Sequence, residues 1–300
     1  MTSISDLTKD LKQGDIKALA RAITYVENEI TGSAALLENI DARATPTIGI
    51  TGPAGAGKSS LVNSLIHLLL MQKQRIGVVA VDPSSPFNYG SLLGDRIRLA
   101  DHFNNSEVFI RSVATRGSLG GLSDKIMEVV FVMSAFPFDY IFIETVGVGQ
   151  SEVELAGLAD TTIVTMVPDA GDEIQTMKAG LMEIADIFVV NKADHVGADR
   201  FAKNLRSLSA SRINDEWKIP VLKTIATAKE GISELHQEIL RHQQAGFSNK
   251  RKPFLLAEKC WRIIQKEKMK EVNKKMLLKE ITRLMSDQYF NVYRFAKHYF

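Results

Sequence analysis

A short glycine-rich run in the first quarter of the chain has the composition of a phosphate-binding loop. Its residues are Gly52, Pro53, Ala54, Gly55, Ala56, Gly57, Lys58 and Ser59, followed by Ser60. They fit the pattern G-x-x-x-x-G-K-[ST], in which glycines let backbone amides approach phosphates, the lysine reaches the β- and γ-phosphates, and the hydroxyl coordinates Mg²⁺. The run stands at the start of a predicted apolar helix, and the N-terminus of a helix favours anions. We therefore expect this run to bind a nucleoside triphosphate.

A second motif predicts the base of that nucleotide. Asn191, Lys192 and Asp194 form N-K-x-D directly after an apolar run. The Asp194 carboxylate can accept two hydrogen bonds from guanine N1–H and the exocyclic amine, a donor pair that adenine lacks. Alone the motif could be an ordinary turn, but its position after a phosphate-binding loop favours GTP and GDP over adenine nucleotides.

A third segment, further along the chain, is a candidate for holding the base through backbone amides. It consists of Ala226, Thr227 and Ala228, which precede Lys229, Glu230 and Gly231. Many GTPases use an S-A-K-like loop at this place. The pattern is equally compatible with a plain turn.

Three acidic residues predict a magnesium site. Asp82, Asp95 and Glu144 lie at or near the ends of β-rich runs. A carboxylate at a strand end beside a phosphate-binding loop usually holds Mg²⁺ or its waters, together with the loop hydroxyl, here that of Ser59. Asp95 could instead cap the helix that follows it.

The residues after Glu144 indicate how hydrolysis would be controlled. Gly147 lies three residues after Glu144, as the glycine of a D-x-x-G switch does, where its amide could sense the γ-phosphate. No glutamine follows Gly147 immediately, so we expect slow intrinsic hydrolysis that a partner or a closing loop completes. Lys178 is a candidate cation for that step, although it could be a solvated helix lysine. The expected catalytic residues are Lys58, Asp82 and Lys178.

Seven short β-rich runs alternate with helix-like stretches and would position these residues. The runs are Thr45–Thr51, Arg75–Val81, Val108–Val113, Tyr140–Thr145, Thr161–Val167, Ile187–Val190 and Val221–Ala226. Several are apolar almost throughout, as expected for parallel strands covered by helices on both faces. The pattern predicts an α/β fold with a doubly wound, mostly parallel sheet, in which ligands bind beyond the carboxyl ends of the strands.

Helical segments flank this centre on both sides. We expect an N-terminal helical extension at residues 1–44, a nucleotide-binding domain at 45–245 and a C-terminal helical region at 246–300, with a linker near Gly246–Pro253. Residues 250–283 are rich in Lys and Arg interleaved with apolar residues, which favours a partner subunit over nucleic acid. The aromatic residues of the tail are expected to be buried, in the protein or at an interface. They are Tyr289, Phe290, Tyr293, Phe295, Tyr299 and Phe300.

Composition limits the other possibilities. The 300 residues include 37 Lys and Arg against 35 Asp and Glu, which gives no reason to expect a nucleic-acid partner. No apolar run approaches the roughly 20 residues of a membrane-spanning helix. Acidic residues among the first lysines argue against a secretory signal or a transit peptide. Cys260 is the single cysteine, which excludes an internal disulfide and fits a reducing, cytoplasmic setting.

Taken together, the motifs resemble the MeaB/ArgK family of P-loop GTPases, which includes the methylmalonic aciduria type A proteins. The resemblance covers about residues 10–245. In chain order the matching motifs are G-P-A-G-A-G-K-S, V-D-P-S-S-P-F, L-L-G-D-R-I-R, R-G-S-L-G-G-L, E-T-V-G-V-G-Q-S-E, D-E-I-Q and N-K-A-D.

The resemblance implies a G-protein chaperone that gates cofactor loading of an adenosylcobalamin-dependent acyl-CoA mutase such as methylmalonyl-CoA mutase, and that protects the mutase. An adenosyltransferase is an implied second partner, and adenosylcobalamin would be met only through the mutase. The resemblance also implies that Ser59, Asp82, Asp95 and Glu144 surround the metal and that 172–178 is a mobile switch with Lys178 at its end. Homodimerisation through the C-terminal helices is a further implication. The alternatives are a kinase associated with arginine/ornithine transport and a nickel-delivery GTPase.

Overall fold

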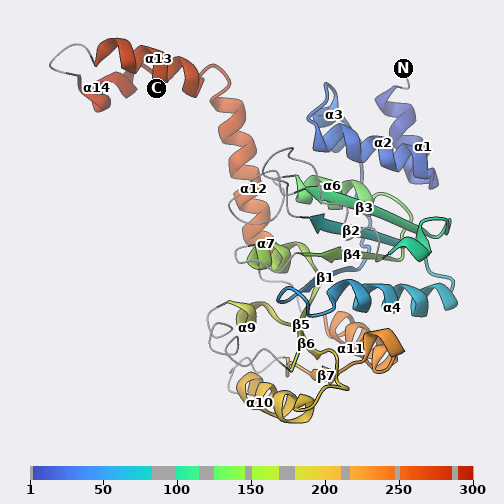
Figure 1. Cartoon of the computed structure of the whole chain (residues 1–300). Helices are drawn as coiled ribbons and strands as arrows, with labels where there is room; N and C mark the ends of the chain where they lie inside the picture. The colour runs from blue at the N-terminus through green and yellow to red at the C-terminus, as the bar shows by residue number, and fades with distance from the viewer. Residues whose placement is uncertain are drawn as a thin grey trace. The chain divides into compact units, whose positions relative to one another are not determined.

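The computed structural model describes residues 3–82, 99–114, 125–145, 151–168, 180–210, 217–246, 251–285 and 290–299. The chain divides into two compact units, Met1–Asn249 and Lys250–Phe300. The two units are described separately below, and Figure 1 labels their helices and strands.

Seven parallel strands form the centre of the first unit (Figure 1). The strands are β1 Thr47–Thr51, β2 Ile76–Asp82, β3 Val108–Ala114, β4 Tyr140–Glu144, β5 Thr161–Met166, β6 Ile187–Val190 and β7 Val221–Lys223. Their order is β3-β2-β4-β1-β5-β6-β7, so the chain crosses over β1 when it passes from β4 to β5. The predicted doubly wound α/β fold is confirmed, and the loop after β1 lies where the order reverses, the usual place for a ligand.

Helices cover both faces of this sheet. In the first unit they are α1 Ile4–Gln13, α2 Ile16–Glu27, α3 Ser33–Asn39, α4 Lys58–Met71, α6 Ile126–Ser134, α7 Ser151–Leu158, α9 Leu181–Ile184, α10 Ala198–Ala210 and α11 Ile232–Gln244, with the 3-10 turns η1 Ala100–His102 and η2 Ala226–Ala228. Among the described residues, none of these helices is long and apolar enough to span a bilayer.

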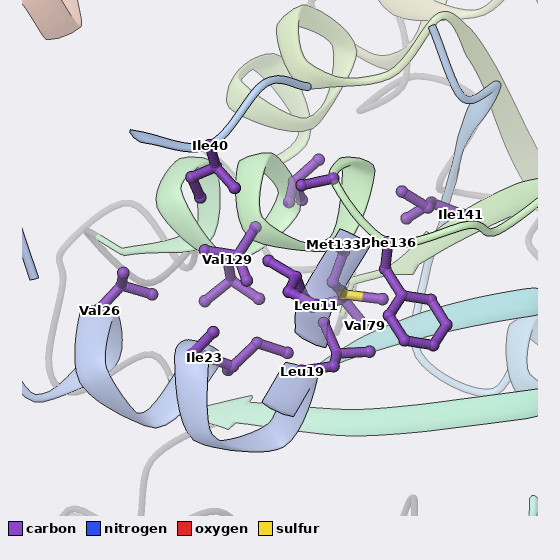
Figure 2. Packing of buried hydrophobic residues seen from close by; sticks show 14 of the residues in the cluster. Leu11, Leu19, Ile23, Val26, Ile40, Val79, Val129, Met133, Phe136 and Ile141 are labelled. Carbon is purple, nitrogen blue, oxygen red and sulfur yellow. The ribbon is translucent and has the colours of Figure 1, made fainter. Parts of the chain in front are cut away.

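The N-terminal helices pack onto the sheet domain through a shared core. Leu11 and Leu19, from α1 and α2, belong to one buried cluster with Val129 and Met133 of α6 and Val79 of β2 (Figure 2). Burial of aliphatic side chains at three- and four-residue spacing explains why the segments of α1 and α2 are helical. The predicted boundary between residues 44 and 45 therefore separates elements that share one hydrophobic core, and its functional meaning stays a prediction.

The opposite face of the sheet is covered by the helix that follows the glycine-rich run. Leu61 and Leu65 of α4 are fully buried in a cluster with Ile48 and Ile50 of β1 and with Leu235 of α11. Because α4 packs along β1 and α11, its N-terminus is fixed above the carboxyl end of β1. This packing sets the place of the candidate site.

Aspartates before three strands fix how neighbouring strands begin. Asp139, Asp160 and Asp186 each precede a strand, and each accepts a backbone N–H from an adjacent segment of the sheet edge. The Asp160 carboxylate, for example, accepts the Thr47 amide at 3.0 Å. Each of these backbone amides thereby has a hydrogen-bond partner. The carboxyl ends on the opposite edge are thereby held in register.

The second unit is helical, with α12 Arg251–Lys268, α13 Lys274–Leu284, α14 Val292–Ala296 and the turn η3 Lys297–Tyr299. The predicted linker ends earlier than expected, because α12 already begins at Arg251 and includes Pro253 in its first turn. Proline is tolerated there, since first-turn amides have no partner within the helix. Tyr293 of the tail is 81% exposed within this chain, so for this residue burial inside the chain is excluded and burial at an interface stays a prediction.

The shared core predicts a large cost for truncating one buried leucine. Leu19→Ala should lower the free energy of unfolding by about 2–5 kcal/mol, because Leu19 is fully buried between α2, α6 and the sheet. The control is Ile16→Ala on the same helix, where the side chain is 37% exposed and the expected loss is below about 1 kcal/mol. Urea denaturation of both variants measures the difference. Equal losses would mean that α2 does not pack as described.

Candidate nucleotide-binding site

Two glycines of the loop after β1 allow it to lie against the neighbouring strands. Gly52 has φ +135°, and a Cβ there would lie 1.9 Å from the carbonyl oxygen of Thr165 in β5. Gly57 has φ +82°, and its Cβ would lie 2.3 Å from the Asn191 amide nitrogen. Only glycine fits both the backbone conformation and the space. The loop is therefore closely packed on the side facing β5 and β6.

The same loop is open at its middle. A Cβ added at Gly55, which has φ +77°, would meet no atom within 4 Å. The helix α4 begins directly after Gly57, which as the N-cap residue has no side chain to bond the first turn. The first amides of a helix lack intrahelical partners and favour an anion. The loop and the helix start together form a cradle suited to phosphate groups.

Lys58 lies folded over this loop. Its Nζ donates hydrogen bonds to the carbonyl oxygens of Gly52 at 2.8 Å and Pro53 at 2.9 Å, and the residue is only 7% exposed. Backbone carbonyls hold the ammonium group at the cradle without neutralising its charge. An entering phosphate would therefore meet a fixed positive charge.

The predicted metal ligands Ser59 and Glu144 are brought together. The Ser59 hydroxyl donates to Oε1 of Glu144 at 2.5 Å, and both residues are buried. Glu144 ends β4, where it lies beside Ile50 of β1 and Ala80 of β2. Oxygen donors of this type, hydroxyl and carboxylate, are those that Mg²⁺ prefers.

The other predicted ligands are described only in part. The backbone of Asp82 ends β2, next to β4, which places it at the same edge of the sheet as Glu144. The Asp82 side chain and all of Asp95 lie outside the described residues, as do Gly147 and Lys178.

A chain of buried hydroxyls leads from β4 to the start of α7. Thr145 donates to the Thr51 hydroxyl at 2.9 Å, and Thr51 donates to Oε1 of Glu152 at 3.4 Å. Burial raises the pKa of Glu152, while the Thr51 hydrogen bond and the charge of Lys58 act in the opposite direction. Sequence reasoning assigned none of these roles, because the hydroxyls are far apart in the sequence.

Asn191 connects the glycine-rich loop after β1 (the phosphate loop, residues 52–59) to the segment after β7 that was predicted to hold the base (the base loop, residues 226–228). Its amide nitrogen donates to the Ala56 carbonyl at 2.9 Å, and its amide oxygen accepts from the Thr224 hydroxyl and the Ala226 N–H, each at 3.1 Å. Asn191 is 2% exposed, so these bonds replace water. The structure places this predicted residue as a tie between loops. Thr224 was missed by the sequence analysis because a threonine directly after a strand gives no information about the distant side chain that it binds.

The remaining residues of the N-K-x-D motif are on the surface. Lys192 adopts φ +54°, and the Ala193 N–H donates to the Thr224 carbonyl at 3.0 Å, which fixes the turn. Asp194 is exposed at this turn, next to the loop of η2. Its carboxylate is therefore accessible to a base that would lie on the surface between the two loops.

The predicted base loop forms a 3-10 turn after β7. Ala226 is buried, whereas Thr227 and Ala228 are exposed. Lys229 with φ +60° and Gly231 with φ +73° close the loop before α11. The described residues of the phosphate loop, the N-K-x-D motif and this turn therefore meet at the carboxyl ends of β1, β6 and β7.

Comparison with known families supports the chemistry that this geometry allows. The family model described as methylmalonyl-CoA mutase-associated GTPase MeaB matches residues 19–279. That range contains the whole candidate site and part of the second unit.

Individual relatives agree with this match. A Pyrococcus horikoshii protein with a provisional GTPase name is 46% identical over 252 residues, which cover 81% of this chain and 79% of the relative. The GTPase ArgK of Escherichia coli is 36% identical, with 81% and 77% covered. The mitochondrial methylmalonic aciduria type A homolog of Mus musculus is 35% identical, with 77% of this chain and 61% of the relative covered.

Solved structures share the fold. The crystal structure of a LAO/AO transport system kinase matches with a TM-score of 0.71 at 26% identity and covers 99% of this chain and 96% of its own. HypB from Helicobacter pylori in complex with nickel matches with a TM-score of 0.51 at 15% identity, over 75% of this chain and 97% of its own. The second likeness concerns the fold alone.

The raised pKa of Glu152 predicts that removing its charge increases the stability of the folded protein, by an amount that depends on pH. When a carboxyl group has a higher pKa in the folded than in the unfolded protein, the folded protein loses stability as the pH rises above the pKa of the unfolded state. Glu152→Gln should therefore melt at a higher temperature than the wild type at pH 7.5, and the gap should shrink near pH 4. Thermal unfolding at both pH values measures it.

The control for this experiment is Glu234→Gln, which changes an exposed carboxylate on α11 and should alter stability by no more than about 0.5 kcal/mol. A Glu152→Gln protein that melts below the wild type at pH 7.5, or whose gap is the same at both pH values, would contradict the assigned burial effect.

Proposed function

The chain belongs to the MeaB family and is a P-loop GTPase, and from that premise we propose that it is a chaperone of an adenosylcobalamin-dependent acyl-CoA mutase. The observation that carries the proposal is the family match over residues 19–279, whose description names methylmalonyl-CoA mutase. The described site agrees with the GTPase part of that description. In this proposal, hydrolysis of GTP to GDP and phosphate gates cofactor loading and protects the mutase.

The nucleotide would bind across the two loops that Asn191 connects. Residues 52–60 would hold the phosphates, with Lys58 turning from the loop carbonyls to the β- and γ-phosphates. Asp194 would accept the two guanine donors, and the backbone of 226–228 would contact the base. Lys192 would lie against the base plane through its aliphatic stem.

The proposed metal is Mg²⁺, held by Ser59, Glu144, Asp82 and Asp95. The contact between Ser59 and Glu144 supports this set, because a hydroxyl and a carboxylate that already touch can both turn toward a hard cation. When bound, Mg²⁺ would neutralise charge on the β- and γ-phosphates. Ser59 would bind and orient the metal, and the acidic residues would hold its remaining ligands in place.

Control of hydrolysis is proposed to lie in the segments after β4 and β5. Gly147 would sense the γ-phosphate through its amide, and loss of that phosphate would release the loops around it. Lys178 would supply the positive charge that hydrolysis needs once the mutase is bound. The chain would then act as a timer that turns over slowly until its partner is present.

The second unit is proposed as the homodimer interface, within the region 246–300 assigned from the sequence. Support comes from large apolar side chains that this chain leaves exposed, among them Phe254 at 66%, Trp261 at 59% and Leu278 at 67%. Exposed apolar surface of this kind is typical of interaction sites. An adenosyltransferase is the proposed further partner, which would supply the cofactor to the mutase.

A second candidate function is favoured by one comparison. The likeness to the LAO/AO transport system kinase extends over 99% of this chain, so a phosphoryl-transfer role in transport deserves a direct test. If this role is correct, incubation of the chain with γ-labelled GTP and a periplasmic binding protein would transfer the label to the binding protein. The nickel-delivery alternative has no support beyond the shared fold.

The proposed base contact predicts a change of nucleotide preference. Asp194→Asn should lower GTP affinity by about 10- to 100-fold, because two hydrogen bonds to a charged acceptor are lost, and should leave the weak ATP affinity unchanged. The control is Asp199→Asn, which alters an exposed carboxylate in the first turn of α10. Competition binding with both nucleotides measures the ratio. An unchanged preference for GTP would remove Asp194 from base recognition.

The mutase proposal predicts stimulated turnover. Addition of methylmalonyl-CoA mutase should raise the GTPase rate, and Lys178→Ala should reduce that stimulation at least about tenfold while GTP still binds. Lys203→Ala, on the exposed side of α10, is the matched lysine control, and Lys58→Ala should bind no nucleotide. Phosphate release with and without mutase measures all four proteins.

Two results would count against this reading. No stimulation of the wild type by the mutase would remove the chaperone proposal and leave the GTPase assignment intact. Equal stimulation of the wild type and Lys178→Ala would remove only the role of Lys178.

A further inference from the structure

We propose that Ser64 is a positioning residue for guanine recognition, acting through the backbone of Ala226. The inference rests on the proposed nucleotide site and deepens it. Ser64 lies outside every motif that the sequence analysis identified, in the middle of α4.

The contact that carries this inference joins two distant parts of the chain. The Ser64 hydroxyl donates to the Ala226 carbonyl oxygen at 2.6 Å, across 162 residues of sequence. Ser64 is 4% exposed and Ala226 is 3% exposed. A serine inside a helix commonly bonds a carbonyl of its own preceding turn. Here the hydroxyl is used to hold a loop instead.

The backbone of Ala226 is held from both sides by buried side chains. Its N–H donates to the Asn191 amide oxygen at 3.1 Å, and its carbonyl accepts from Ser64 and from the Lys229 N–H at 3.1 Å. Since both peptide groups of Ala226 are fixed, the direction of the following amide, that of Thr227, is fixed as well, whereas the Ala228 N–H donates within the turn to the Ile225 carbonyl at 3.0 Å. Within the segment proposed to contact the base, the Thr227 amide is therefore the one that Ser64 would orient.

Ser64 also links the base loop to the phosphate cradle. The helix that carries it begins with Lys58 and Ser59, and an α-helix rises about 1.5 Å per residue, so Ser64 lies roughly 7.5 Å along the axis from Ser59. A helix of this length is rigid, and it packs against both β1 and η2. The separation between the proposed phosphate and base subsites is therefore set by one element, and Ser64 supplies a hydrogen bond from it to the base loop.

Removal of the Ser64 hydroxyl should lower the affinity for GTP and for GDP by the same factor. In Ser64→Ala the buried Ala226 carbonyl keeps, within the described part of the chain, only its bond from the Lys229 N–H, and the base loop gains freedom that binding must remove. The Kd values of GTP and of GDP, measured by calorimetry with Mg²⁺, should both rise about five- to tenfold. KM for GTP should carry the effect, whereas kcat at saturating GTP should change less than twofold.

A matched control separates positioning from general stability. Ser134 is also buried, and its hydroxyl donates to the Phe131 carbonyl at 2.8 Å within α6, on the other face of the sheet. Ser134→Ala should lower the melting temperature about as much as Ser64→Ala and leave the GDP affinity unchanged. Ser64→Cys keeps a weaker donor of similar size, so its loss of nucleotide affinity should lie between those of the wild type and Ser64→Ala. The same variant replaces Ser64→Ala in the test if Ser64→Ala does not fold.

The outcomes are distinguishable. If the wild type binds GDP and both Ser64 variants bind it equally well, the role of Ser64 is overturned and the nucleotide site stands. A loss for GTP without a loss for GDP would place the effect at the γ-phosphate and also overturn it. A wild type that binds neither nucleotide at millimolar concentration would overturn the site itself and Ser64 with it.

Discussion

The buried amide of Asn191 is the interaction on which the candidate site depends. A side-chain amide removed from water must satisfy both its donor and its acceptor, because each unpaired group costs free energy. Asn191 does so by bonding the phosphate loop through its nitrogen and the base loop through its oxygen. Gly57 is required by the same contact, since a side chain there would occupy the place of the amide. Two loops that are distant in sequence are thereby held as one site.

The sheet supplies the framework that makes such a tie possible. All seven strands are parallel, so their carboxyl ends lie at one edge, and the order reversal at β1 leaves a gap that the glycine-rich loop fills. Aspartates at the opposite edge hold the strand starts in register. The core on each face then fixes α4 above β1. The topology thus brings the loops of the site to one edge of the sheet, and the bonds of Asn191 then hold them together.

The sequence predicts the elements well and the cross-links poorly. Apolar runs bounded by polar turns identify all seven strands, and the glycine spacing identifies the tight loop between β1 and α4, because both depend on local pattern. The start of α12 was misplaced since a proline suggested a linker, although a proline in a first turn is compatible with a helix. Thr51, Thr224 and Ser64 could not be found, because an isolated hydroxyl gives no information about which distant group it will meet.

Electrostatics gives a physical reason to propose a cation besides Lys58 at this site. Glu144 is buried beside Ser59, and Glu152 lies half-buried near the same loop. A triphosphate entering this cradle would meet two carboxyl groups in a region of low dielectric constant, where repulsion between like charges is strong. One ammonium group and the start of a helix offset only part of that repulsion. A divalent ion held by Glu144 and Ser59 would offset this repulsion, which is the physical reason for proposing Mg²⁺ at this site.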